Sequence, residues 1–240
     1  SNARLVIGNV SNSNLANVKP NVTVSTVAGS GAVGSTNGFG AAAKFNNLRG
    51  IAAGHGPSQG SFFVADSNND TIRQLSGDGT VTTFAGTALS PGATDGTGAA
   101  AQFNTPQQVA VDNSGNVFVA DSLNHTIRRI TPLGAVTTIA GTPGTAGNAD
   151  GLGNVATFNT PVGIAVNADA SNIYVSETND IRLVQFTGGA LNQATSYTVS
   201  TVAGSSSPGF VDSNSGSPSF NTPPKPAPVP EPFGHGPLSV

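Results

Sequence analysis

One motif returns along this chain at a nearly constant interval, and such a period restricts the fold to architectures built from copies of one unit. The motif is Val-Thr-Thr-Phe-Ala-Gly or a close variant, and its copies end at Gly29, Gly86, Gly141 and Gly204. A second marker, Phe-Asn, begins at Phe45, Phe103, Phe158 and Phe220. Because the two markers recur with nearly the same spacing, we infer that one structural unit is repeated along most of the chain.

Each unit contains short apolar runs rich in Val, Ile, Thr and Phe, and Gly, Asn, Ser and Pro separate these runs. This pattern favours strands over helices. In the second unit the expected strands are 108–112, 116–121, 126–130 and 135–140. The connection from Asp112 to Asn116 suits a tight hairpin, since Asn and Gly tolerate the positive φ that such turns require. We therefore predict that each unit is a four-stranded antiparallel meander.

A single meander cannot bury both of its faces, whereas radial stacking of several sheets covers each face with a neighbour. The sequence therefore predicts an all-β fold, a β-propeller of four-stranded antiparallel blades. Residues 4–29 parallel residues 182–204, so we expect the N-terminal segment to supply the last two strands of a blade. The chain then holds about four repeat units, and one of them is split between the two termini.

Three segments carry a family resemblance: Gly-Ile-Ala-Ala at 50–53, Gln-Val-Ala-Val-Asp at 108–112 and Gly-Ile-Ala-Val-Asn at 163–167. Each is followed by an aromatic-Val-Ala/Ser-Asp/Glu run and then by Ile-Arg. In these features the chain resembles the NHL-repeat family, over roughly residues 22 to 223. The resemblance implies a β-propeller but no particular activity, because members of this family do unrelated jobs.

NHL-like enzymes such as the peptide-amidating lyase bind zinc through several channel histidines. This chain has only three histidines, which are dispersed at His55, His125 and His235. His55 and His235 share the sequence Gly-His-Gly-Pro, and we expect them in loops opposite to the loop that carries His125. The resemblance therefore does not extend to that zinc chemistry.

The two ends of the chain differ from the repeats. Ser1-Asn2-Ala3 resembles the scar left when a protease removes a purification tag, so we assign the repeats to residues 4–223. In residues 224–240 proline first occupies every second position. This segment is either an extended polyproline linker or a closing innermost strand with its prolines on the free edge. A ring of four blades, a fragment of a larger ring and two complementary chains all stay open as ways to complete the fold.

Composition excludes several classes of function. Charged residues make up only 9% of the chain and the net charge is -3, so no basic patch for nucleic acid is expected. No apolar stretch is long enough for a membrane span, so we expect no membrane insertion. With no cysteine, disulfides, thiolate catalysis and cysteine-ligated metal sites are excluded. The pattern is typical of a bacterial secreted or periplasmic protein, and we expect an extracytoplasmic location.

Two sets of loops should share one face of the ring: the turns between the second and third strands, and the long connections between units. Rigidly mounted loops of this kind often carry function. We therefore choose this face as the candidate binding face. Its candidate residues are Asp66, Asn69, Asp70, Asp121, Asn124, His125, Glu177, Asn179 and Asp180.

Repetition itself favours a structural role for the acidic residues, because a catalytic group is needed only once. Each acid precedes an arginine on the next strand, and we expect it to cap the hairpin and to form one of the pairs Asp66–Arg73, Asp121–Arg128 and Glu177–Arg182. Asp66, Asn68 and Asp70 have EF-hand spacing, but the turn glycine and the closing glutamate are missing, so calcium of that type is not expected.

The glycine-rich stretches at 95–98 and 150–153 lack the following helix of a phosphate loop. We interpret them as turns that lead through one helical turn to a phenylalanine, which fills a gap between blades. The phenylalanines concerned are Phe45, Phe103, Phe158 and Phe220.

We predict a noncatalytic binding or interaction scaffold for a protein, peptide or glycan, with no catalytic residues and no resident cofactor. The alternative is a channel-based extracytoplasmic enzyme, a lyase, lactonase or glycan-acting hydrolase, with a metal held by inward carboxylates. A structural or channel ion such as calcium, and a homo-oligomer that completes the ring, also stay open. A cluster of acidic or histidine side chains at one channel mouth would favour the enzyme.

Overall fold

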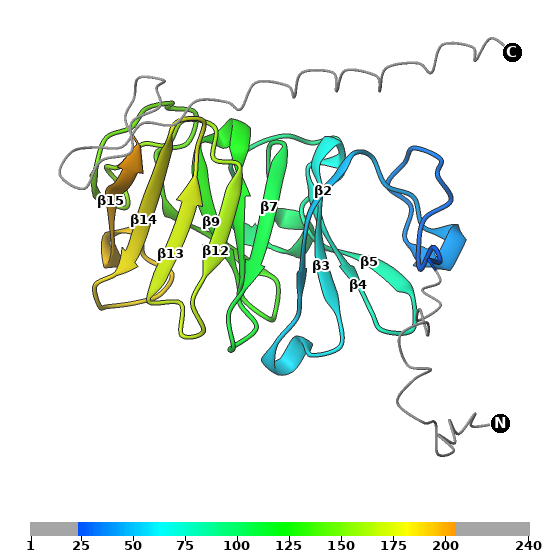
Figure 1. The fold of residues 1–240 in the computed structure, drawn as a ribbon. Helices are drawn as coiled ribbons and strands as arrows, with labels where there is room; N and C mark the ends of the chain where they lie inside the picture. Colours follow the sequence, from blue (N-terminus) through cyan, green and yellow to red (C-terminus); the bar gives the residue numbers. More distant parts are fainter. Residues whose placement is uncertain (1–23, 205–240) are drawn as a thin grey trace, which may run out of the picture.

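The computed structural model describes residues 24–204. These residues form an all-β fold of three five-stranded antiparallel sheets with short 3-10 helices, and no α-helix occurs among them (Figure 1). The predictions for the tag scar, for residues 4–23 of the N-terminal strands, for the Phe220 marker and for the Pro-rich segment lie outside the described residues. The part of the N-terminal prediction that covers residues 24–29 was wrong, because these residues form no strand and pair with no strand of the described part of the chain.

The three sheets follow one another along the chain. The first contains β1 (Gly38–Phe39), β2 (Leu48–Ala53), β3 (Phe62–Asp66), β4 (Thr71–Leu75) and β5 (Thr80–Ala85). The second contains β6 (Gly96–Thr97), β7 (Pro106–Val111), β8 (Val117–Asp121), β9 (Thr126–Ile130) and β10 (Ala135–Ala140). The third contains β11 (Gly151–Leu152), β12 (Gly163–Val166), β13 (Asn172–Ser176), β14 (Asp180–Phe186) and β15 (Tyr197–Gly204).

Four consecutive strands of each sheet form the predicted meander, and the strands of the second sheet match the predicted ranges closely. The prediction of four-stranded blades was wrong in one respect, because every sheet has a fifth strand. This strand, β1, β6 or β11, lies in the long connection before the meander and pairs with the last strand of the sheet. It has two residues in each sheet, too few for an alternation of apolar and polar side chains to reveal it.

The first strands of the meanders, β2, β7 and β12, lie next to one another, and the sheets stack face to face from there (Figure 1). Between the first and second sheets Phe63 and Ile72 pack near Val119. Between the second and third sheets Phe118 packs near Val175. Among residues 24–204 the sheets form an open row and not a closed ring.

The marker phenylalanine behaves as predicted in two of the repeats. Phe103 and Phe158 are fully buried, each within the apolar core between two sheets. Phe45, at the open end of the row, is only half-buried. The role of this residue therefore depends on having a sheet on both sides.

Candidate functional site

The two sets of loops expected on one face do meet there. The backbone N–H of Leu89, in the connection to the second sheet, donates to the carbonyl of Asn69 in the β3–β4 turn at 3.1 Å. The N–H of Gly144 donates in the same way to the carbonyl of Asn124 in the β8–β9 turn, at 3.0 Å. The candidate residues of the first two sheets therefore lie where turn and connection touch.

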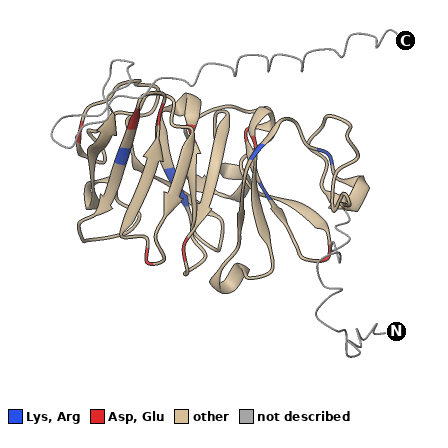
Figure 2. Ribbon diagram, in the orientation of Figure 1, with Lys and Arg blue, Asp and Glu red and all other residues tan. Residues whose placement is uncertain are grey.

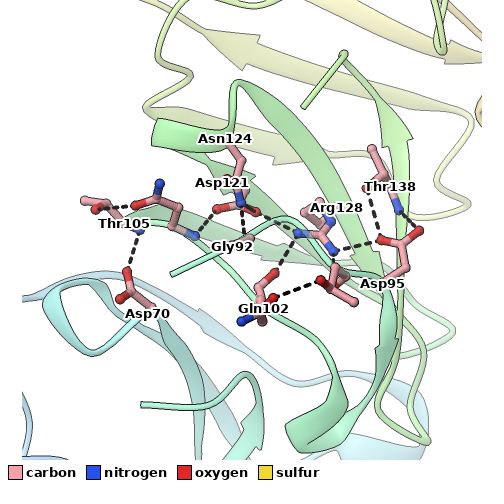
Figure 3. Close-up of polar contacts among 11 residues, drawn as sticks. Asp70, Gly92, Asp95, Gln102, Thr105, Asp121, Asn124, Arg128 and Thr138 are labelled. Atoms are coloured by element: carbon pink, nitrogen blue, oxygen red, sulfur yellow. Dashed lines mark hydrogen bonds and ion pairs between the residues drawn. The ribbon is translucent and has the colours of Figure 1, made fainter. Parts of the chain in front are cut away.

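The centre of this region in the second sheet is a buried arginine (Figure 3). Arg128 Nη1 donates to Asp121 Oδ2 at 2.8 Å and to the carbonyl of Gln102 at 2.9 Å. Arg128 Nη2 donates to the carbonyl of Thr94 at 3.1 Å and to Asp95 Oδ1 at 2.8 Å. The guanidinium thus joins strand β9 to the long connection that precedes its own sheet.

The acceptors of Arg128 are themselves held in place. Asp121 Oδ1 accepts the backbone N–H of Asn104 at 2.8 Å, and its Oδ2 accepts Asn124 Nδ2 at 2.7 Å. Asp95 accepts both the N–H and the hydroxyl of Thr138, at 3.1 and 3.0 Å. Burial raises the pKa of Asp121 to about 6, and Arg128 and the two amide donors oppose this rise.

The first sheet repeats this arrangement. Arg73 Nη1 lies 2.7 Å from Asp66 Oδ2 and also donates to the carbonyl of Lys44. Asn37 Oδ1 accepts Arg73 Nη2 at 2.8 Å, in the place of Asp95. In all three sheets the guanidinium also lies over the ring of the marker phenylalanine, at 5.1 to 5.3 Å from the ring centroid.

The predicted pairs of Asp66 with Arg73 and of Asp121 with Arg128 are confirmed. Within its own hairpin turn each acid accepts the side-chain amide of Asn69 or Asn124, but neither makes a side-chain cap to the short helix that follows it. Each carboxylate instead accepts the backbone N–H after a marker phenylalanine, that of Asn46 or Asn104. The long connection thus supplies the backbone donor to each acid, and the local turn supplies a side-chain amide.

The third sheet carries a weaker version of the network. Glu177 Oε2 is 3.5 Å from Arg182 Nη1, and it is buried without a hydrogen-bond partner. The stretch between Glu177 and Arg182 is two residues shorter than its counterparts, because the acid precedes the arginine by 5 residues and not by 7, and the turn has no equivalent of Asn124. The side chain of Asn148, in the long connection, donates to Asp180 instead. Arg182 keeps its other acid, Asp150 Oδ1, at 2.8 Å.

We expect Glu177 to make stability fall as pH rises. Burial, assisted by Asp180, raises the pKa of Glu177 from 4.5 to about 7, against the opposing effects of the Asn159 N–H and Arg182. The folded state therefore holds this proton between pH 4.5 and 7, where the unfolded chain has lost it. Its stabilising effect is complete below the lower value and is lost as pH rises through the upper one.

Urea unfolding of the chain and of Glu177→Gln at a series of pH values checks this expectation. The free energy of unfolding should decline more steeply with pH in the parent than in the variant, since glutamine does not titrate. Because the raised pKa of Asp121 acts in the same direction in both proteins, the difference between them isolates Glu177. Parallel pH profiles would contradict the assignment.

Most candidate residues are covered by the network and its connections. The buried ones are Asp66, Asn69, Asp70, Asp121, Asn124, Glu177 and Asp180. His125 and Asn179 are partly exposed. A ligand role for the whole set stays a prediction. Other side chains of this face do reach solvent, among them Leu89 and Leu123, which are 71% and 49% exposed.

Two of the candidate residues link neighbouring sheets. Asp70 Oδ1 accepts the backbone N–H of Thr105 at 2.9 Å, and His125 Nδ1 accepts the N–H of Thr160 at 3.2 Å. Burial raises the pKa of Asp70, against the effect of the Thr105 N–H. In the first and second sheets the last residue of the β3–β4 or β8–β9 turn thus links its sheet to the next one.

Sequence reasoning missed the second acceptor of each arginine. These residues are Asn37, Asp95 and Asp150, and each directly precedes a glycine at the same place in its repeat. Their recurrence in register was a usable signal, but we assigned the stretches only to turns. Because the arginines lie 32 to 36 residues further along the chain, only the fold brings the groups together.

Charged side chains are few and scattered over the sheets (Figure 2). Within residues 24–204 no group of three or more His, Asp or Glu side chains is placed to hold a metal ion. In the same range the innermost strands β2, β7 and β12 carry Arg49, Gln107 and Gln108 but no acid and no histidine. No helix of the described part of the chain is long and apolar enough to cross a membrane.

Comparisons with known proteins support the repeat that the sequence and the three sheets show. The family model described as NHL repeat matches residues 103–130, from the phenylalanine marker to the end of β9. Human NHL repeat-containing protein 2 is 35% identical over 127 residues, which are 49% of this chain and 18% of that protein. The chloroplastic protein SUPPRESSOR OF QUENCHING 1 of Arabidopsis thaliana is 31% identical over 134 residues, 52% of this chain and 12% of that protein. The chain thus spans less than a fifth of the length of these relatives.

Among solved structures, an auxiliary nutrient binding protein from Bacteroides ovatus is similar with a TM-score of 0.48 and 20% identity, over 67% of this chain and 39% of that one. The sequence motifs recur in three similar sheets, and one copy of the repeat, residues 103–130, matches the NHL repeat model. This chain thus contains a match to the NHL repeat at residues 103–130 and is similar over about half of its length to NHL repeat-containing protein 2.

Proposed function

We propose that this chain is a noncatalytic binding scaffold of the NHL-repeat type, with a protein or peptide as its partner. The observation that supports this proposal is the use made of the repeated ionisable residues. In the first two sheets the acid and the arginine are buried and bonded to each other and to backbone groups. Their chemistry fixes the loops, so recognition falls to side chains that differ between repeats.

Such variable positions occur at the start of the innermost strands, at the edge that faces the candidate loops. Arg49, Gln107 and Val162 occupy the same place in the three repeats, and all three are at least partly exposed. Leu48 pairs with Asp66 and Pro106 with Asp121, which puts these strand starts beside the arginine network. A guanidinium, an amide and an aliphatic side chain on one rigid rim suit the backbone and side chains of a peptide.

We also propose that the sheets are blades of a closed β-propeller outside the cytoplasm, without a resident cofactor. Stacking is already seen at two junctions, and both outer sheets leave apolar side chains exposed, such as Ile51 at one end and Val202 at the other. Closure of the ring would cover such faces. Fractionation of cells that express the full-length gene tests the location.

Selection of peptides from a random display library by the immobilised chain tests the binding function. A selected peptide should lose affinity by about tenfold or more for a variant with Arg49→Ala, Gln107→Ala and Val162→Ser. The matched control changes exposed residues of the opposite edge, His55→Ala, Gln59→Ala and Leu133→Ser, and should bind like the parent. Both variants should unfold at the same thermal midpoint as the parent, so that a loss of affinity does not come from unfolding.

Two outcomes would contradict this function. One is the failure to select any peptide whose binding depends on the three rim residues. The other is turnover of a lactone, ester or polysaccharide by the chain, lost in the rim variant and kept in the control. That second result would favour the channel-based enzyme.

A further inference from the structure

The two described junctions between sheets use the same backbone hydrogen bond with different acceptors. At the first junction the N–H of Thr105 donates to Asp70 Oδ1 at 2.9 Å (Figure 3). At the second junction the N–H of Thr160 donates to His125 Nδ1 at 3.2 Å. Asp70 and His125 both end their turns with a positive φ, +55° and +59°. The same contact is thus made by a carboxylate in one place and by an imidazole in the other.

The imidazole differs from the carboxylate in its response to acid. A ring nitrogen accepts a hydrogen bond only while it carries no hydrogen, so the contact with Thr160 requires a neutral His125 with its proton on Nε2. A second proton would go to Nδ1, and two N–H groups would then face each other. A carboxyl group keeps an acceptor oxygen even when it is protonated. Acid can therefore remove the acceptor of the second junction but not that of the first.

The donor at the second junction belongs to a backbone that needs support. Thr160 has a φ of +55°, which is a strained conformation for a β-branched residue. The preceding N–H, that of Asn159, donates to Glu177 Oε1 of the third sheet at 2.9 Å. Phe158, one residue earlier, is fully buried in the core between the two sheets. Loss of the bond at Thr160 would therefore act on the short stretch that ties the second sheet to the third.

No described group is placed to reward protonation of the ring. Residues 141–149 and 156–162, which lie against the turn of His125, contain no ionisable side chain. The ionisable groups of the other elements around the ring are Asp121 and Arg128 of the second sheet and Glu177, Asp180 and Arg182 of the third. Each has a partner within the described networks, and none of the described ion pairs includes His125. A second proton thus costs the bond to Thr160 and gains no ion pair among residues 24–204.

We propose that the junction between the second and third sheets is proton-sensitive and opens locally at Thr160 when His125 takes up a second proton, while the junction at Asp70 stays closed. The bond requires the neutral ring, so its contribution to stability is present at neutral pH. That contribution is lost as pH falls through about 6.5, where histidine side chains usually gain a proton. The apolar core holds the sheets together, so the opening is local. The proposal does not depend on the proposed binding function.

Amide hydrogen exchange of the full chain, followed by NMR at about pH 7.5 and about pH 5 and corrected for the intrinsic rates, tests the proposal. The protection of the Thr160 amide should fall by about tenfold or more in acid, whereas that of Thr105 should not change. His125→Asp gives the second junction the acceptor of the first, so the Thr160 amide should stay protected at both pH values. Asp70→His is the reverse exchange and should make the Thr105 amide acid-sensitive.

The comparison with His125→Asp also controls for Glu177, which bonds the neighbouring amide. Burial raises the pKa of Glu177 to about 7, so this group titrates in the same interval. It is present in both proteins, and a difference between them belongs to the ring. A loss of Thr160 protection that is equal in the parent and in His125→Asp would overturn the proposal, because another group would then be the cause.

The tautomer of the ring gives a readout that needs no substitution. The ¹⁵N chemical shifts of His125 at neutral pH should show a proton on Nε2 and none on Nδ1. A ring with its proton on Nδ1 could not accept the N–H of Thr160, and this result would overturn the proposal. Equal protection of the Thr160 amide of the parent at the two pH values would do the same.

Discussion

Replacement of Asp121 by alanine should lower the free energy of unfolding by about 3–5 kcal/mol, a large share of the stability of a domain. The change leaves the fully buried Arg128 without its buried carboxylate and leaves the Asn104 N–H and the Asn124 amide without their acceptor. The exposed partner Asp95 remains, but it is half in solvent and cannot replace a desolvated charge. Urea unfolding of parent and variant measures the loss.

Glu177→Ala is the matched control, because the residue has the same place in the third sheet. Its carboxylate is 3.5 Å from Arg182 and has one oxygen without a partner, so alanine removes mainly the hydrogen bond from the Asn159 N–H. We expect a loss of about 1 kcal/mol. Equal losses in the two variants would show that the close geometry around Asp121 adds nothing. An unchanged Asp121→Ala variant would refute the structural role of the network.

Replacement of Gly86 by alanine should destabilise the fold by about 3 kcal/mol or more. Gly86 has a φ of +95°, and a Cβ there would lie 2.6 Å from the carbonyl oxygen of Asp70 and 3.1 Å from Phe103 Cδ2. The added methyl group therefore meets backbone that cannot rotate away. Gly86, the glycine of the repeated motif, therefore lies where the end of strand β5 passes close to the β3–β4 turn.

Gly98→Ala separates the two causes of that loss. Gly98 also has a positive φ, +56°, but a Cβ there would have no atom within 4 Å. Its substitution should cost only the backbone strain, about 1 kcal/mol. Equal thermal midpoints of the two variants would contradict this interpretation, because they would mean that the backbone around Gly86 moves aside without cost.

The strands were predictable because they depend on local pattern. Runs such as 126–130 and 135–140 combine β-branched residues with Gly and Pro at their ends, and the structure has strands over these same ranges. Four such runs per period indicate a stacked meander even before any contact is known. The pairing of Asp121 with Arg128 was predictable for a related reason, since both lie on adjacent strands of one hairpin.

The candidate site was only half predictable. Its loops meet as expected, but short polar residues in turns are usually exposed, and Asp66, Asn69 and Asp121 are buried instead. The cause is the long connection, which folds over the turn and supplies acceptors such as Asp95 from far along the chain. No short stretch of the sequence contains both Asp95 and Arg128. The only sequence signal for their contact was that a residue of this kind recurs at the same place in each repeat.

Local pattern and periodicity thus account for the all-β fold, for the repeating unit and for the order of strands within it. Three features arise only when sheets and connections pack together: the burial of the polar turn residues, the fifth strand, and the hydrogen bonds of Asp70 and His125 to the next sheet. The physical reason is the range of the interactions. Strand formation depends on neighbouring residues, whereas each of these features joins groups that lie tens of residues apart and that acquire their partners only on packing.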